Sequence, residues 1–266
     1  MSGGESGRMA NAADREKVVE VINPGAAGPV VLVCEHASSH IPAEFADLGL
    51  SAADRLSHAV WDPGAEALGR AIAERLDAPF VAGRMSRLLY DCNRPLSSEA
   101  AMPKQVELVA VPGNAGLTAT DRAERADRFY EPFRSTVAAT LDGVAAPVLV
   151  TIHSFTPTYF GEPRAVEIGI LHDSDTRLAD AMLENNGPLS HCRVARNEPY
   201  GPADGVTHTL KEHALARGIA NVMIEVRNDL LTSEGEVARI ADALVASLTT
   251  AQAALDSTQS VAAHHA

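Results

Sequence analysis

The sequence predicts an α/β protein built as a single three-layer domain, in which helices flank a mostly parallel, mixed central sheet. Short runs of apolar and β-branched residues alternate along the chain with longer stretches of helical character. Strands that alternate with helices are typical of βαβ units, whose parallel strands carry helices on both faces. The 266 residues are enough for one such domain with a sizeable core.

Five apolar runs are predicted to form the strands of the sheet. The first spans residues 29–34 (PVVLVC) and ends at the polar segment EHASSH, a pattern that is typical of a buried strand followed by a loop. The other four runs share this character, and they span residues 79–82, 147–152, 166–171 and 221–226.

The stretches between these runs are predicted to be helices. They span residues 64–76, 118–141, 175–184, 207–217 and 233–254. Ser233 and Glu236 have the spacing of a capping box, which predicts that the last helix begins at this point.

Both ends of the chain are expected to lie outside the domain. Residues 1–15 are small and polar without a hydrophobic period, which predicts a disordered leader. Residues 257–266 are likewise predicted to be a flexible tail. The sequence thus predicts a single catalytic α/β domain over residues 16–256.

Composition excludes several classes of function. A net charge of -13 disfavours binding to nucleic acid or to an anionic membrane. The three cysteines lack a CxxC spacing, so neither a disulfide framework nor a zinc ribbon is indicated. Neither a signal peptide, a membrane-spanning run nor a glycine-rich phosphate loop is visible. We therefore expect a cytoplasmic protein that binds neither nucleic acid nor membranes.

Polar residues that follow the predicted strands point to a functional site. Ligands of open α/β sheets bind outside the carboxyl ends of the strands, where residues from different strands converge. His36 follows the first strand, His153 and Ser154 follow the third, and Glu225 lies in the fifth. These side chains are expected to meet at one edge of the sheet.

Two histidines and a carboxylate match the ligands of a catalytic zinc ion, which also keeps an open position for water. His36 and His153 supply the imidazoles. Asp62, at the mouth of a predicted helix, is our choice for the third ligand. Glu35 is the alternative, although neighbours on an extended segment point to opposite sides.

Glu225 is the candidate general base, because a water activated by zinc needs a carboxylate that is not itself a ligand. An unpaired carboxylate in an apolar strand would be costly to bury, so a partner or a function must compensate. Arg227, two residues further on, is a possible structural partner, and it is also a candidate substrate contact.

The segment SRLLYDCNRP is predicted to hold a substrate carboxylate. It places Arg87, Asn93 and Arg94 around an apolar turn, and a guanidinium beside an amide suits a carboxylate. A structural salt bridge of these arginines, for example with Asp91, is the alternative. Ser154 is a further candidate for contact with the substrate.

Other reactive residue types are interpreted as structural. Four histidines in loops carry no supporting pattern, and His208 and His213 lack the spacing that places two ligands on one helix face. No GxSxG elbow marks a nucleophilic serine, and the cysteines are interpreted as small apolar fillers. The four loop histidines are His40, His58, His172 and His191.

Four motifs make the chain resemble the N-formylglutamate amidohydrolases: CEHASSHIP, SRLLYDCNRP, TIHSFTP and IEVRNDLL, in this order. The similarity extends from about residue 30 to residue 248. This family is similar in architecture to zinc carboxypeptidases and zinc-dependent cell-wall amidases. The resemblance therefore implies a phosphorylase/hydrolase-like α/β fold with a metal ion at the strand ends.

The resemblance also implies roles for individual residues. His36 and His153 would bind zinc, Glu225 would act as general base, and the pair Asn93 and Arg94 would hold a carboxylate. The third ligand does not carry over, because Ser39 stands where a carboxypeptidase has the glutamate of its HxxE motif. The implied reaction is hydrolysis of N-formyl-L-glutamate or a related small acidic N-acyl amino acid.

Two alternative functions remain at this stage. The first is a peptidoglycan-amidase-like enzyme or another zinc amide hydrolase; the peptidoglycan enzyme would need a wide groove and usually an export signal. The second is a metal-free protein that only binds a carboxylate. Such a binding protein has no use for a general base, so the presence of His36, His153 and Glu225 together argues against it.

Overall fold

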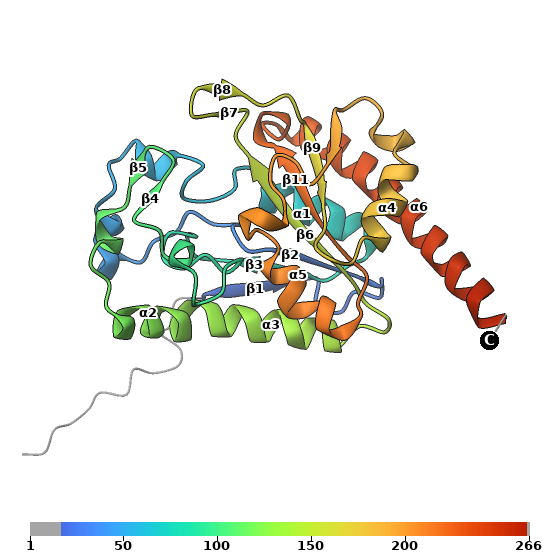
Figure 1. Cartoon of the computed structure of the whole chain (residues 1–266), viewed down its shortest axis with the longest axis horizontal. Coiled ribbons are helices and arrows are strands. Elements are labelled where there is room, and N and C mark those ends of the chain that lie inside the picture. The colour runs from blue at the N-terminus through green and yellow to red at the C-terminus, as the bar shows by residue number, and fades with distance from the viewer. Residues whose placement is uncertain (1–16, 265–266) are drawn as a thin grey trace, which may run out of the picture.

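A computed structural model describes residues 17–264 of the protein and their side chains up to residue 257 (Figure 1). The leader that we expected over residues 1–15 lies outside the described residues. A seven-stranded sheet forms the centre, with strands in the order β1-β3-β2-β6-β11-β9-β10. These strands are β1 (Val19–Ile22), β2 (Val30–Cys34), β3 (Phe80–Gly83), β6 (Val148–Phe155), β9 (Ile168–Leu171), β10 (Val194–Arg196) and β11 (Asn221–Arg227).

The sheet is mixed and mostly parallel, as the sequence predicts. Strands β3, β2, β6 and β11 run parallel to one another, and β9 pairs with β10 in parallel. β1 pairs with β3 and β9 pairs with β11 in antiparallel fashion. In the parallel pair of β11 and β6, Glu225 stands opposite His153. The register thus places two of the predicted site residues side by side.

Helices cover both faces of the sheet and complete the three layers (Figure 1). Apolar side chains on one face, such as Leu68, Leu178 and Leu244, pack against the strands from α1 (Ala65–Leu76), α4 (Arg177–Glu184) and α6 (Glu234–His264). On the other face Phe133 and Leu210 do the same from α3 (Glu131–Asp142) and α5 (His208–His213). Periodic burial of apolar residues thus drives the assembly of the layers.

The predicted helices are present, with some changes at their ends. The helix predicted over residues 118–141 consists of α2 (Ala119–Arg125), a π-helical turn at Ala126–Tyr130 and α3. Ser233 caps α6, because its hydroxyl accepts a hydrogen bond from the Glu236 amide at 3.3 Å. Helix α6 continues to His264 and so runs through most of the segment expected to be a tail.

The sequence pattern missed the two outer strands of the sheet. β1 reads VEVI and is only partly buried, and β10 has three residues that are partly buried or exposed. Short edge strands of this kind bury little apolar surface, so their sequences lack the continuous apolar run of a central strand. Both pair with strands that the pattern did predict.

Two small hairpins and a separate apolar cluster lie outside the main sheet. The hairpins are β4 (Gln105–Val106) with β5 (Val109–Ala110), and β7 (Thr158–Tyr159) with β8 (Glu162–Pro163). The cluster includes Leu48, Leu89, Met102 and Phe129, and it holds together the loops that follow β2 and β3. Among the described residues, no helix is both long and apolar enough to cross a bilayer.

Candidate active site

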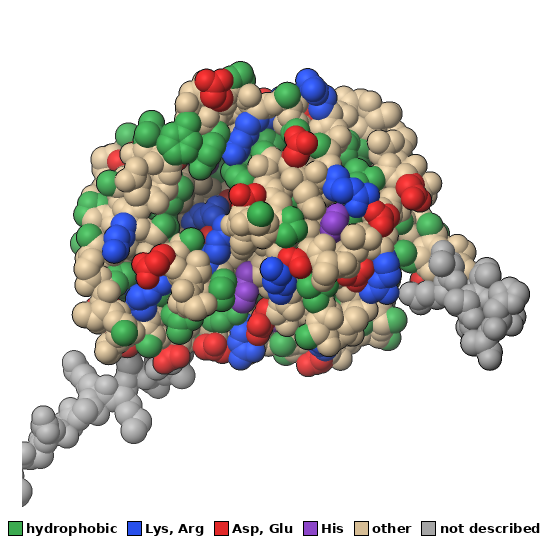
Figure 2. Space-filling view, viewed as in Figure 1, with side chains coloured by type: hydrophobic (Ala, Val, Ile, Leu, Met, Phe, Trp, Pro, Cys, Tyr) green, Lys and Arg blue, Asp and Glu red, His purple; other side chains and the backbone are tan. Residues whose placement is uncertain are grey.

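A cavity of about 290 Å³ opens where β2, β6 and β11 approach their carboxyl ends. Figure 2 shows it as a hollow in the face turned toward the viewer, with basic side chains visible inside. Its walls include most of the site residues predicted from the sequence: His36, Asp62, Arg87, Asn93, Arg94, His153, Ser154 and Glu225. The cavity is therefore the place where the predicted chemistry converges.

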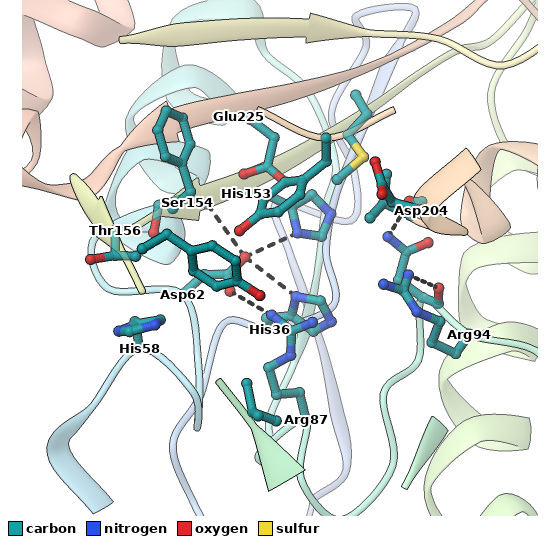
Figure 3. Close-up of a pocket in the computed structure, with 17 residues that line it drawn as sticks. His36, His58, Asp62, Arg87, Arg94, His153, Ser154, Thr156, Asp204 and Glu225 are labelled. Carbon is teal, nitrogen blue, oxygen red and sulfur yellow. Dashed lines mark hydrogen bonds and ion pairs between the residues drawn. The ribbon is translucent and has the colours of Figure 1, made fainter. Parts of the chain in front are cut away.

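Asp62 lies between the two predicted histidine ligands (Figure 3). Its Oδ2 atom is 3.3 Å from Nδ1 of His36 and 3.0 Å from Nδ1 of His153. The three side chains come from the loop after β2, the loop before α1 and strand β6, and all three are buried. Residues that are far apart in the sequence thus direct three potential donor atoms to one point.

The other nitrogen of each imidazole faces a carboxylate. Nε2 of His36 lies 2.7 Å from Oδ1 of Asp91, and Nε2 of His153 lies 3.0 Å from Oε2 of Glu35. The second contact is an ion pair whose angles do not meet those of a hydrogen bond. Carboxylates in these positions orient an imidazole and leave its opposite nitrogen for a ligand. Glu35 therefore lies behind His153, outside the group that includes Asp62.

The turn Asp62-Pro63-Gly64 holds the Asp62 carboxylate in place. The Asp62 amide donates to the His36 carbonyl at 3.0 Å, and the Ser154 amide donates to Oδ2 of Asp62 at 3.3 Å. Gly64 has a φ of +82°, and a Cβ atom there would lie 2.5 Å from Cβ of Leu231. Only glycine fits this close turn, which leads directly into α1.

Opposite charges dominate the electrostatics of this buried group. Burial disfavours the charged form of each of these side chains. The opposite charges beside them favour the charged form more strongly than burial disfavours it. The pKa of Asp62 is held below its usual range mainly by His36 and His153, and that of Asp91 mainly by His36 and Arg87. The pKa values of His36 and His153 are raised by their carboxylate partners. A divalent cation could replace the protons that these imidazoles share with Asp62.

The donor set fits a metal ion. Potential ligand atoms of His36, Asp62 and His153 all lie within 4.8 Å of one another. Two imidazole nitrogens and a carboxylate oxygen are the ligands that zinc takes in catalytic sites. The buried group of His36, Asp62 and His153 could therefore bind a metal ion.

Glu225 faces the same cavity from β11 (Figure 3). Its side chain is buried, and burial raises its pKa to about 7. Its Oε2 atom makes no hydrogen bond to any residue that the structure describes. This carboxyl group can thus exchange a proton near neutral pH, as a general base must.

The structure does not bring Arg227 to this site. Its guanidinium pairs with Asp229 at 2.8 Å and with Glu167 at 3.3 Å, and it also donates to the Arg164 carbonyl. Arg227 is not part of the cavity wall, and none of these hydrogen bonds goes to Glu225. Two nearby acidic residues pair with this arginine instead. The structure therefore supports neither role predicted for Arg227, as a partner of Glu225 or as a substrate contact.

Arg87 lies in the wall of the cavity but is already paired. Its guanidinium donates to Oδ2 of Asp91 at 2.8 Å and to Oδ1 of Asp62 at 3.3 Å. These are the structural salt bridges that the sequence left as an alternative. Because a guanidinium has five donor hydrogens, two such bonds leave others for a ligand.

Asn93 and Arg94 do not act together on a ligand, as the sequence predicts, but make different contacts. The Asn93 amide donates to the Val206 carbonyl at 2.5 Å and accepts from the Thr209 amide at 3.0 Å. Its polar atoms therefore anchor the start of α5. Arg94 donates to the carbonyls of Asn93 and Gly205 through Nη1 alone. The rest of its guanidinium remains available to a ligand in the cavity.

Sequence reasoning missed several members of the site. Asp91 was considered only as a partner of an arginine, although its spacing of four residues from Arg87 within a polar motif was a usable signal. His58 was set aside and yet lies in the wall. The wall also contains an exposed acid and three aromatic rings, for which no sequence pattern exists: Asp204, Phe155, Tyr159 and Tyr200.

Residues 28–232 match the model of the N-formylglutamate amidohydrolase family. The chain belongs to this family. It is therefore a hydrolase of a family that acts on an amide bond, which confirms the resemblance noted in the four motifs.

Two solved structures are similar to this chain. A gene product of Agrobacterium tumefaciens is 50% identical, with a TM-score of 0.87 over 92% of this chain and 98% of that one. An N-formylglutamate amidohydrolase from Ralstonia eutropha is 21% identical, with a TM-score of 0.64 over 88% of this chain and 97% of the other. At 21% identity, the similarity to the Ralstonia protein shows a shared fold only. A comparison with curated proteins finds no match.

Proposed function

We propose that the protein hydrolyses the amide bond of an N-acyl amino acid, N-formyl-L-glutamate or a related compound, with the help of zinc or another divalent cation. The products are a carboxylate and a free amino acid. The observation that carries this proposal is the position of Glu225, a carboxyl group with a pKa of about 7, in the same cavity as the group of His36, Asp62 and His153.

In this proposal His36, Asp62 and His153 hold the cation. When bound, a divalent cation polarises the acyl carbonyl and lowers the pKa of a water molecule. Asp91 and Glu35 keep the imidazoles oriented through their Nε2 atoms, at 2.7 and 3.0 Å. With Nε2 of each ring held in this way, Nδ1 would be available to bind the cation.

Glu225 is assigned to the proton transfer. Its carboxylate takes a proton from the attacking water, whose oxygen forms a bond to the acyl carbon. The C–N bond then breaks, and Glu225 returns the proton to the departing nitrogen. A pKa of about 7 suits both directions, because the group accepts and releases a proton at similar cost near neutral pH.

Arg94 and Arg87 are assigned to binding the substrate. Arg94 has free guanidinium donors at the cavity and would hold the α-carboxylate. Arg87 would direct its remaining donors at the acyl oxygen as negative charge develops there. Ser154 is also in the wall, but its hydroxyl donates to the Pro63 carbonyl at 2.7 Å, so its contribution is through position or an accepted hydrogen bond.

The size of the cavity favours this function over the two alternatives. A volume of about 290 Å³ is near the lower end for small-molecule sites and suits a single N-acyl amino acid better than a cell-wall polymer. A protein that only binds carboxylates would not need a buried acid with a pKa near 7. A cytoplasmic location, and the absence of binding to nucleic acid or membranes, stay predictions.

The test combines metal analysis with product release. Protein purified without chelator should contain close to one equivalent of a divalent metal and release formate from N-formyl amino acids. Treatment with a chelator should abolish the activity, and added zinc should restore it. Metal without any deformylation would redirect the proposal to another acyl group, whereas a metal-free protein that binds N-formyl-L-glutamate would contradict it.

A further inference from the structure

The charges in the cavity wall indicate how many carboxylates a substrate carries. Arg87 is paired with Asp62 and Asp91, and His58 is paired with Glu107 at 2.9 Å. Both catalytic imidazoles face carboxylates as well. Within the described part of the chain, the wall therefore contains one cationic side chain without an acidic partner, which is Arg94.

The remaining wall is apolar, neutral polar or acidic. Aliphatic, thioether, aromatic and neutral polar side chains line it, and Asp204 adds an exposed carboxylate next to Gly205, whose carbonyl accepts from Arg94 (Figure 3). Asp204 accepts a hydrogen bond from the Gly201 amide at 2.8 Å, and among the described residues it forms no ion pair with a basic side chain. A second carboxylate on the substrate would meet this wall without a counter-charge. The other lining residues are Val106, Phe155, Thr156, Tyr159, Tyr200, Val206 and Met223.

A further guanidinium near the cavity, that of Arg164, is used to build the wall. It stacks at 4.3 Å from the ring centre of Tyr159 and at 4.7 Å from that of Tyr200, and it donates to the Tyr200 hydroxyl at 2.9 Å. Phe155 lies at 5.6 Å. Arg164 itself is not part of the cavity lining. The guanidinium is thus in contact with three rings and holds them together as one aromatic surface.

Glu107 joins the two hairpins at the mouth of the cavity. Its Oε1 accepts from the Phe160 amide in the turn between β7 and β8 at 2.8 Å, and its Oε2 pairs with His58. Glu107 itself lies in the turn between β4 and β5. The hairpins that supply Val106 and Tyr159 are thereby held together, and His58 faces an acidic partner at the rim.

From this charge inventory we propose that the substrate is an N-acyl amino acid with one carboxylate and an uncharged, largely apolar side chain. The α-carboxylate binds Arg94, and the side chain packs against the aromatic surface. A second carboxylate would have to be desolvated there without a partner, which is costly. This inference rests on the proposed amide hydrolysis and narrows its substrate class away from acidic amino acids.

Three substrates of similar length test the inference: N-formyl-L-methionine, N-formyl-L-glutamine and N-formyl-L-glutamate. With the metal-loaded full-length protein, we expect kcat/KM for the methionine compound to exceed that for the glutamate compound at least tenfold, with glutamine between them. A value for glutamate equal to or above that for methionine overturns the inference while the amide hydrolysis stands. Hydrolysis of none of the three contradicts the proposed function instead.

Two further measurements make the result independent of turnover. Calorimetric binding of the same three compounds to Glu225→Gln should give the same order of affinities, and the reverse order overturns the inference even if the acyl group is not formyl. Asp204→Asn removes the charge at the rim but keeps an acceptor for the Gly201 amide. This variant should reduce the ratio of the affinities for the methionine and glutamate compounds at least threefold. An unchanged ratio of affinities removes the electrostatic basis of the inference.

Discussion

Glu225 stands directly opposite His153 on the adjacent parallel strands β11 and β6. A carboxyl group with a pKa of about 7 therefore lies beside an imidazole whose far nitrogen faces the Glu35 carboxylate. The two strands lie in the middle of the sheet, where both faces are covered by helices. The rigid core thus fixes the spacing between the proposed base and a proposed metal ligand.

Replacement of the proposed base tests this arrangement. We expect Glu225→Gln to lower kcat by a factor of about 10² to 10⁴, the contribution of general base catalysis, because the amide cannot accept a proton. The metal content should remain that of the wild type, since Glu225 is outside the group of three donors. Initial rates and elemental analysis on the same preparation measure both effects.

The matched control is Glu124→Gln, which makes the same change at an exposed position on α2. Its rate and metal content should equal those of the wild type. Activity of Glu225→Gln within threefold of the wild type would remove Glu225 from the mechanism. Loss of metal in this variant would instead show that the carboxylate contributes to the metal site.

The acids behind the histidines give a second prediction. Asp91→Asn replaces the acceptor of the His36 Nε2 hydrogen, so we expect metal affinity or activity to fall about 10- to 100-fold. Asp62→Asn should lose the metal more completely, because Asp62 supplies a donor atom itself. Competition with a chelator of known affinity measures both variants. Equal affinities for Asp62→Asn and the wild type would exclude Asp62 as a ligand.

The sequence was sufficient to predict the central strands and the residues at their ends. His36, His153 and Glu225 were selected because each lies at or near the polar end of an apolar run, and the structure brings all three to one cavity because such ends converge in a parallel sheet. Asp62 was selected for its place at the mouth of a predicted helix, and the structure places it between the two imidazoles. These inferences depend on local pattern and on topology, both of which are visible in one chain.

Partners that are distant in sequence could not be predicted. The Asn93 amide is occupied by Val206 and Thr209, more than a hundred residues later, and Arg227 is captured by Glu167, 60 residues earlier. A polar side chain has the same sequence signature whether it faces a ligand or a backbone group. Only the tertiary structure decides which contacts it makes.

Arg94 should dominate binding of the substrate carboxylate. We expect Arg94→Met to raise KM by about 10- to 100-fold, corresponding to the loss of a charged hydrogen bond of roughly 1.5–3 kcal/mol. The effect on kcat should be smaller, because the carboxylate is distant from the reacting bond. Steady-state kinetics separate the two constants. A fall in kcat with an unchanged KM would show that Arg94 acts on the reaction rather than on binding.

His213 makes a prediction about stability at acidic pH. Burial at the end of α5 lowers its pKa from 6.5 to about 4, with Glu212 and Glu35 opposing this shift and His208 and Arg134 adding to it. The unfolded chain therefore binds a proton between pH 6.5 and 4 that the folded protein does not. The stability that the neutral imidazole confers is present above pH 6.5, and about 3 kcal/mol is lost as the pH falls to 4.

Urea unfolding of wild type and His213→Gln between pH 7.5 and 4 measures this contribution. A chelator in both samples prevents metal release from affecting the comparison. The glutamine cannot titrate, so the free energy of unfolding of the variant should fall less steeply with decreasing pH. The difference between the proteins should shift by about 3 kcal/mol in favour of the variant. The exposed control His191→Gln should follow the wild type, and parallel curves for His213→Gln would refute the assignment of the acid-sensitive proton to this buried imidazole.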